Sequence, residues 1–220
     1  MNQPICKIPN TYGTRLGTLS VLLVAVSLAG AGLADSKTQA PTEITVFDGN
    51  AVAPFRLFIG DKAGWAVPVG EGAVSSNAGL LTVERDPEDG AISATWLKKG
   101  EAQLYLANAE PDDLTALVDA DGALVVLMKV NMAPNKNVTL RMGCGYPCAA
   151  NADISKLLNA LPENEWLRVS FDLRCFANGG LNVSNVDTPF LLLTSGKLSV
   201  TIAEVRLVPG AGPDASIKCS

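Results

Sequence analysis

The chain has 220 residues, with 17 basic and 22 acidic side chains and a formal net charge of −5. A negative chain without any run of basic residues argues against nucleic acid or an anionic membrane surface as a partner. The chain contains no histidine, which excludes the commonest general base, a Ser-His-Asp triad and most transition-metal sites.

The N-terminal segment has the pattern of a secretory signal. Lys7 and Arg15 precede an uncharged stretch from Leu16 to Ala34 that has an apolar centre and ends in small residues. We expect cleavage after Ala34, and an uncleaved membrane anchor is the alternative. Residues 1–34 are thus predicted to be a signal peptide. The protein is predicted to be exported to the periplasm or the extracellular space, with no membrane segment after cleavage.

Cleavage leaves 15 basic and 22 acidic residues, and so a net charge of −7. Residues 35–42 are polar and are predicted to be a short linker. Residues 43–220 are long enough for one domain with a sizeable core.

The remaining chain alternates between short apolar runs and turn residues. Apolar and polar side chains alternate strictly over residues 138–142, 166–173 and 197–202, which indicates half-buried strands. Further strand candidates are Ile44–Phe47, Phe55–Ile59, Leu80–Glu84, Ile92–Leu97, Gln103–Ala107 and Leu124–Val130.

One short helix is expected at Ile154–Leu161, where Asp153 can cap the first turn and Pro162 follows the last. Roughly nine or ten strands at this spacing predict an all-β fold, an antiparallel β-sandwich of the jelly-roll type.

The cysteines agree with export. Cys144, Cys148, Cys175 and Cys219 follow the signal, and an even number in an exported chain favours two disulfides. The Gly-Tyr-Pro segment between the first two can form a tight turn, so we favour Cys144–Cys148 and hence Cys175–Cys219. The second bond would order the C-terminal tail by cross-linking rather than by strand pairing. Other pairings and a four-cysteine zinc site are the alternatives.

Paired carboxylates are the remaining candidates for catalysis. Glu88 and Asp89, and likewise Asp112 and Asp113, could serve glycoside hydrolysis. Both pairs lie beside prolines in turn-like segments, where acidic side chains are commonly just solvated. We therefore expect no catalytic residues and no enzyme activity.

Two acidic turns could contribute oxygen ligands to a structural calcium ion. They are residues 119–122 and 48–50. Hairpin-turn chemistry explains both segments without a metal, so no metal site is assigned and no other cofactor is expected.

Aromatic and arginine side chains are the candidates for ligand binding. Trp166 lies opposite the inward Val169 in its alternating run, Tyr105 lies opposite Leu104 and Leu106, and Trp65 lies in a loop rich in glycine and proline. Structural alternatives are a Trp166 packed beneath the short helix and arginines engaged in cross-strand ion pairs. The predicted ligand-binding residues are Trp166, Tyr105, Trp65, Arg141 and Arg168, while Phe47, Phe58, Phe171, Phe190 and Trp96 are predicted core residues.

A set of spaced motifs resembles one known family. The motifs are Pro54-Phe55-Arg56-Leu57, Glu88-Asp89 followed by Trp96, Cys144-Gly145, Cys148, Leu173-Arg-Cys175-Phe176, Thr188-Pro189-Phe190 and Cys219. Together they resemble the galactose-binding-like accessory domain at the C-terminus of ExoP-type exoglucanases of glycoside hydrolase family 3. Phe55 replaces the family's tryptophan, and Pro87 begins a run that differs from the family's.

The resemblance implies a galactose-binding-like sandwich that stands alone here without a catalytic barrel. It implies a secreted, non-catalytic, carbohydrate-associated module. Its expected partner is a β-glucan-like polysaccharide or a separately encoded glycoside hydrolase. An envelope structural or protein-interaction domain without a sugar site is the alternative.

Overall fold

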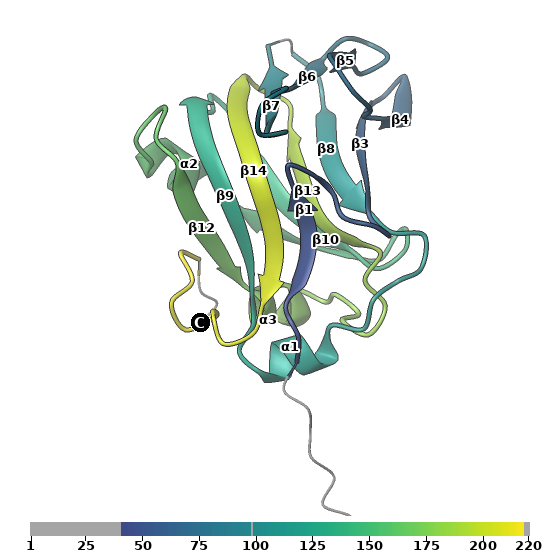
Figure 1. Cartoon of the computed structure of the whole chain (residues 1–220), viewed down its shortest axis with the longest axis vertical. Coiled ribbons are helices and arrows are strands. Elements are labelled where there is room, and N and C mark those ends of the chain that lie inside the picture. The colour runs from purple at the N-terminus through teal and green to yellow at the C-terminus, as the bar shows by residue number, and fades with distance from the viewer. Residues whose placement is uncertain (1–40, 98, 218–220) are drawn as a thin grey trace, which may run out of the picture. The chain divides into compact units, whose positions relative to one another are not determined.

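The computed structural model describes residues 41–97 and 99–217 (Figure 1). Within them, two antiparallel sheets pack face to face as a β-sandwich, which confirms the predicted fold class. The predicted signal peptide lies outside the described residues, as do most of the predicted linker and Cys219.

The larger sheet has eight strands, and its long central strand is β14. The order along the main path is β12 (Leu167–Asp172), β9 (Ala123–Met132), β14 (Leu198–Val208), β7 (Ile92–Trp96), β6 (Leu81–Arg85) and β5 (Val74–Ser75). Two short strands, β1 (Ile44–Asp48) and β2 (Asn50–Ala51), join this sheet because β1 pairs with the second half of β14.

The smaller sheet has six strands. Its order is β11 (Ala149–Asp153), β10 (Val138–Gly143), β13 (Thr188–Thr194), β8 (Ala102–Ala107), β3 (Arg56–Asp61) and β4 (Gly64–Pro68). The helices within the described ranges are α1 (Thr115–Asp119), α2 (Ser155–Ala160) and α3 (Leu173–Asn178).

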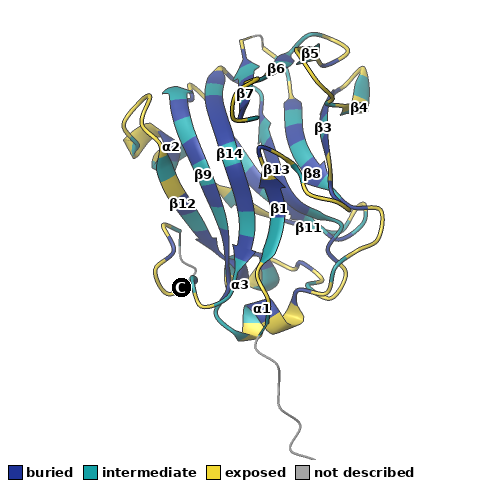
Figure 2. Ribbon diagram, viewed as in Figure 1, coloured by how far each residue is buried: buried dark blue, intermediate teal, exposed yellow. Residues whose placement is uncertain are grey.

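The core lies between the two sheets and is built by alternation. Burial alternates residue by residue along β8 (Figure 2) and along β10. Every second side chain of these strands therefore points inward. Trp96, predicted to be core, is 1 % exposed, and its indole N–H donates to the Ala102 carbonyl at 3.1 Å. Complete burial of each large apolar side chain contributes about 1.5–3 kcal/mol, so these inward rows define the sandwich.

The structure has three helices in its described part, where one was predicted. The predicted helix is present as α2, but its N-cap is Ile154, and Asp153 lies one residue earlier, where its carboxylate accepts from the Ser155 N–H at 2.9 Å. Leu173, expected to continue a strand, begins α3 instead. The Asp172 side chain causes this change, because it caps the helix by accepting from the Arg174 N–H.

Strand β13 was not predicted, because its residues Pro189 to Leu192 are all buried and show no alternation. Leu191 points to the outer side of the sheet yet is only 6 % exposed, since it pairs with Tyr105 on one side and Arg141 on the other. A strand that is covered on both faces has a continuous apolar sequence, without the alternation that identifies a half-buried strand.

The C-terminal tail folds back along β12. The Ile217 N–H donates to the Ser170 carbonyl, and the Asp172 N–H donates to the Ile217 carbonyl, each at 3.1 Å. Cys175 is disulfide-bonded, and its predicted partner Cys219 lies outside the described residues. Backbone pairing thus holds the tail as far as Ile217, whereas the sequence predicted a tail ordered by the cross-link without strand pairing.

In the part of the chain that the structure describes, no helix has the length and apolar character needed to cross a membrane.

Candidate functional site

The outer face of the six-stranded sheet carries an ordered row of side chains. Paired residues on neighbouring antiparallel strands present their side chains on the same face. The pairing places Pro68, Phe58, Tyr105, Leu191, Arg141 and Asn151 in one row across all six strands. At about 4.8 Å between strands, the row spans roughly 24 Å. The first four side chains of the row are apolar or aromatic, and the last two, Arg141 and Asn151, are polar.

A second row lies beside the first and extends this floor. It consists of Gly60, Gln103, Leu193, Thr139 and Asp153, which pair in that order across β3, β8, β13, β10 and β11. Gln103 and Leu193 are half-buried. The centre of the face therefore presents an amide beside an apolar side chain.

Tyr105 is anchored within this floor. Its ring stacks on Phe58 with 5.2 Å between the ring centroids, and its hydroxyl donates to the Trp65 carbonyl at 3.2 Å. Burial raises the pKa of the Tyr105 hydroxyl, so the group remains a neutral donor. The predicted orientation of Tyr105, opposite Leu104 and Leu106, is confirmed. The prediction that Phe58 is a core residue is wrong, because Phe58 lies with Tyr105 on the outer side.

Trp65 lies at one wall of this face. It lies in β4, directly after the turn that joins β3 and β4, and not in a loop as predicted, and it is 44 % exposed. A hollow of about 490 Å³ lies above the sheet, and its lining residues are Trp65, Glu101, Gln103, Arg141, Tyr146 and Leu193.

Tyr146 forms the opposite wall, and the sequence reasoning missed it. The residue lies in a loop closed by the Cys144–Cys148 disulfide, and its side chain is fully exposed. This pairing is the predicted one. Two backbone hydrogen bonds tighten the loop, from the Cys144 N–H to the Cys148 carbonyl at 3.0 Å and from the Cys148 N–H to the Gly145 carbonyl at 2.7 Å. The predicted disulfide around Gly-Tyr-Pro was the feature of the sequence that could have identified Tyr146.

A second hollow of about 490 Å³ adjoins the first. The two share Gln103, Arg141 and Tyr146 in their linings, and the second extends to Asn151 and Asp187. The two hollows therefore form one groove across the sheet, which we call the sheet groove. It is lined by the residues of both hollows.

Arg141 is at the centre of the sheet groove because it lines both hollows. Its Nε donates to the Asn151 side-chain oxygen at 2.7 Å, which fixes the direction of the guanidinium. Across residues 41–97 and 99–217, the ion pairs do not include Arg141. Its remaining N–H donors can therefore serve a ligand without first breaking a salt bridge.

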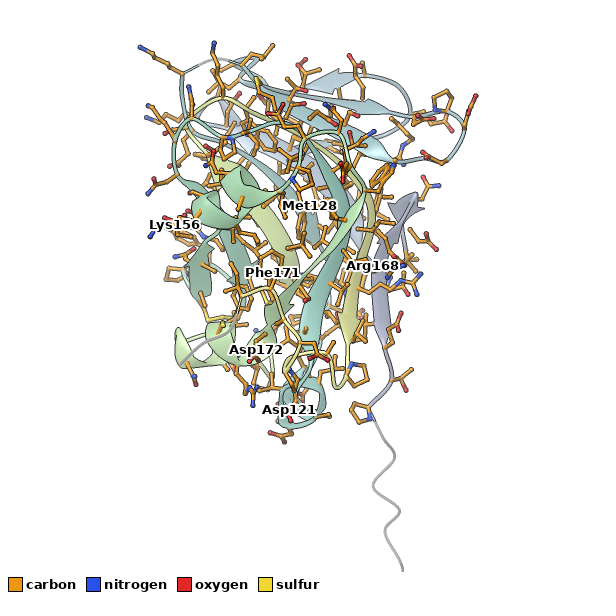
Figure 3. The ribbon with its side chains drawn as sticks, turned by 90° about the vertical axis from the view of Figure 1, so that its left-hand side faces the viewer. Asp121, Met128, Lys156, Arg168, Phe171 and Asp172 are labelled. Atoms are coloured by element: carbon orange, nitrogen blue, oxygen red, sulfur yellow. A yellow bond between two sulfur atoms is a disulfide. The ribbon has the colours of Figure 1, made fainter. Side chains whose placement is uncertain are left out.

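Trp166 and Arg168 lie on the outer side of the other sheet. Trp166 precedes β12 and is 42 % exposed, with the Lys129 ammonium 4.9 Å from its ring centre. Arg168 pairs with Glu204 at 3.2 Å and points away from the core residue Phe171 (Figure 3). The structure thus brings together Trp65, Tyr105 and Arg141 of the predicted binding residues, and places the other two elsewhere.

Two larger hollows lie at the edge of the sandwich, with volumes of about 570 and 610 Å³. The only aromatic side chain in their linings, among the described residues, is the buried Phe55. Glu88 and Asp89 line the second hollow, and the Asp89 carboxylate accepts from the Ala91 N–H at 2.9 Å. These hollows therefore offer turn carboxylates without an exposed ring.

The other acidic segments also serve local structure. Hydrogen bonds from the side chain and backbone of Thr115 hold the pKa of Asp113 below its ordinary value. Asp121, one of the calcium candidates, accepts from Arg174 at 2.6 Å. No group of three or more acidic, cysteine or histidine side chains suited to a metal is present within the described residues.

Solved structures share this fold. The extra C-terminal domain (X) of exo-1,3/1,4-β-glucanase (ExoP) from a Pseudoalteromonas species matches with a TM-score of 0.65 at 20 % identity, covering 80 % of this chain and 98 % of that domain. In the structure of ExoP itself, the match has a TM-score of 0.62 at 20 % identity and covers 84 % of this chain but 22 % of that enzyme.

The family 30 carbohydrate-binding module of the cellulosomal cellulase Cel9D-Cel44B of Clostridium thermocellum has a TM-score of 0.53 at 15 % identity. That match covers 77 % of this chain and 98 % of the module. At these identities the likeness establishes the fold alone.

No curated protein matches the chain. The profile of the ExoP C-terminal family, described as galactose-binding domain-like, matches residues 53–207. Because this match spans well over half of the sequence, the chain belongs to the galactose-binding domain-like family of ExoP-type C-terminal domains.

Proposed function

We propose that this protein is an exported, non-catalytic module that binds a neutral β-glucan-like polysaccharide in the sheet groove. The observation that carries the proposal is the pair of exposed rings, Trp65 and Tyr146, which line one hollow above a polar and apolar floor. A pyranose ring has an apolar C–H face that packs on an aromatic ring, while its hydroxyls need hydrogen-bond partners.

The polar groups of the groove suit hydroxyls, which both donate and accept. Gln103 offers an amide, Arg141 offers donors, and Glu101 and Asp187 offer acceptors. The groove thus mixes one cation with two carboxylates, and the whole chain has a net charge of −5. A polyanionic glycan would meet repulsion from this charge, so the proposed ligand is uncharged.

The absence of histidine from the sequence and the local hydrogen bonds of the acidic turns support a non-catalytic role. Predicted export and the disulfide between Cys144 and Cys148 fit work on an extracellular or periplasmic polysaccharide. In this setting the module would hold glycan alone or near a separately encoded hydrolase.

Trp65, Tyr105 and Arg141 are the proposed binding residues from the sequence, and Tyr146 and Gln103 join them. Trp166 and Arg168 lie outside the groove. A Trp166→Ala variant is therefore the matched control, because it also removes a half-exposed tryptophan, and from the opposite sheet.

The test is affinity electrophoresis through gels containing soluble mixed-linkage, β-1,3- or β-1,4-glucans, together with pull-down on insoluble glucans. We expect the wild-type protein and Trp166→Ala to be retarded equally. Trp65→Ala and Tyr146→Ala should each weaken retardation, and the double variant should abolish it. Equal retardation of all variants would refute the groove as the site. If the wild-type protein is neither retarded nor pulled down by any of these glucans, the protein-interaction alternative would be favoured.

A further inference from the structure

Asp61, the last residue of β3, is a completely buried carboxylate. Its two oxygens accept from the Ala63 N–H and the Ala78 N–H, each at 2.8 Å, and the Ser76 hydroxyl also bonds to it. Among the described residues, the ion pairs do not include Asp61. Burial of a carboxylate is costly unless hydrogen bonds compensate for the lost water, so this arrangement has a structural purpose.

The hydrogen bonds of Asp61 join two segments from different sheets. Ala63 belongs to the turn between β3 and β4 of the six-stranded sheet, whereas Ser76 and Ala78 belong to the connection between β5 and β6 of the eight-stranded sheet (Figure 1). The Asn77 side chain adds a hydrogen bond to the Ala63 carbonyl at 3.3 Å. Asp61 therefore clamps the turn against the neighbouring connection.

The clamped turn leads directly into Trp65. A Cβ atom on Gly60 would lie 2.2 Å from the Trp65 carbonyl oxygen, and one on Gly64 would lie 2.2 Å from the Asn77 side-chain nitrogen. The turn is thus packed too closely to accept larger residues at these two positions. The hydroxyl of Tyr105 holds the Trp65 carbonyl from the floor of the sheet groove.

We propose that Asp61 is the positioning residue that holds Trp65 at the wall of the sheet groove, an inference that rests on the proposed function. Asp61 acts only through the turn and not by contact with the glycan, because its carboxylate is fully buried. Without the clamp, the pairing of β4 with β3 at Gly64 and Val67 and the Tyr105 hydrogen bond still hold the strand. The turn before Trp65 loses its link to the β5–β6 connection, so the indole is less firmly directed for stacking.

Acid should release the clamp. Burial alone raises the pKa of Asp61, but the hydrogen bonds from the Ser76 hydroxyl and from backbone N–H groups outweigh it, so the pKa lies below its ordinary value. The clamp is therefore complete above the unfolded-state pKa and is lost as the pH falls through the lower, folded-state pKa. Charged neighbours are few: Lys62 on the turn and Glu101 beside the paired Ala102 are exposed, and residues 76–79 carry no titratable side chain.

The test uses a Trp166→Phe background. Trp96 is 1 % exposed, so acrylamide quenching of fluorescence then reports mainly on Trp65. Asp61→Asn replaces one carboxylate oxygen, which accepts a hydrogen bond, by an amide nitrogen, whose own N–H groups then face a backbone N–H. Ser76→Ala removes one donor from the carboxylate, together with the hydroxyl oxygen that accepts from the Leu80 and Leu81 N–H groups at 3.1 and 3.2 Å. It is the second variant if circular dichroism shows that Asp61→Asn fails to fold. Asp113→Asn is the control, because it alters a carboxylate that caps a turn before α1.

We expect Asp61→Asn to raise quenching by about twofold as Trp65 moves from 44 % toward full exposure, and Ser76→Ala to do so less. The affinity of Asp61→Asn for a glucan that retards the wild-type protein should fall on the order of tenfold. The fall should be less than about twofold when Trp65 is already alanine. The acid-dependent rise in quenching should be present in the wild-type background and in Asp113→Asn but absent from Asp61→Asn.

Wild-type quenching in both clamp variants would overturn the proposal. So would an equal loss of affinity with and without Trp65, because Asp61 would then act through another route. If the wild-type background binds no glucan, the proposed function fails, whereas the quenching series and its pH dependence still decide whether Asp61 positions Trp65.

Discussion

Replacement of Tyr146 by alanine removes one wall of the sheet groove without touching the core. The side chain is fully exposed, so the free energy of unfolding should change by less than about 0.5 kcal/mol. A tyrosine buries about 150–250 Å² when fully covered, and a sugar on one face would cover roughly half of that, about 100 Å². At about 25 cal/mol per Å², this area corresponds to about 2.5 kcal/mol.

Fixing the exposed side chain on binding offsets about 0.5–1.5 kcal/mol of that gain. Tyr146→Ala should therefore weaken glucan binding by about 1–2 kcal/mol, or roughly 5- to 30-fold. Isothermal titration calorimetry on a soluble β-glucan oligosaccharide measures the change. Tyr146→Phe keeps the ring and should stay within about twofold of the wild-type affinity. Unchanged affinity in Tyr146→Ala, with wild-type binding intact, would refute the role of this wall.

Three further predictions concern the floor, the loop and the tail. Arg141→Leu should lower affinity about fivefold in the same titrations by removing donors to sugar hydroxyls, and an unchanged affinity would contradict this. Replacing Cys144 and Cys148 by serine should leave the circular dichroism spectrum unchanged and lower the free energy of unfolding by about 2 kcal/mol in the chain-entropy model. Glucan binding should weaken because the aromatic ring of Tyr146 loses its fixed position. Wild-type affinity in this variant would argue against a role for the loop. Cys219→Ser should lower stability by roughly 2–4 kcal/mol but leave the Ile217 N–H protected from hydrogen exchange, and its rapid exchange would show that the cross-link orders the tail.

Much of the sandwich was predictable, because alternation is a local property of each strand. Strands such as β8 and β10 bury every second side chain, as predicted. The failures occurred where another interaction replaced that pattern. Strand β13 is covered on both faces, and the Asp172 side chain starts α3 where the apolar repeat predicted further strand.

The candidate site was predictable only in part. Alternation correctly turned Tyr105 outward and left Trp166 exposed, but it cannot tell on which of two sheets an outward residue lies. That assignment depends on strand order, which arises from contacts distant in sequence. Tyr146 lies in a loop without periodicity, so only its position between two bonded cysteines marked it. Phe58 was assigned to the core because hydrophobicity alone does not distinguish a core ring from one that stacks under Tyr105.

The most direct test of the central claim is a chemical-shift titration of the ¹⁵N-labelled protein with a soluble mixed-linkage β-glucan oligosaccharide. We predict saturable shifts of the Trp65 indole N–H and of backbone amides around Gln103, Arg141 and Tyr146, with the Trp166 indole unmoved. Shifts centred on Trp166 and the eight-stranded sheet, or no shifts with any β-glucan, would contradict glycan binding in the sheet groove.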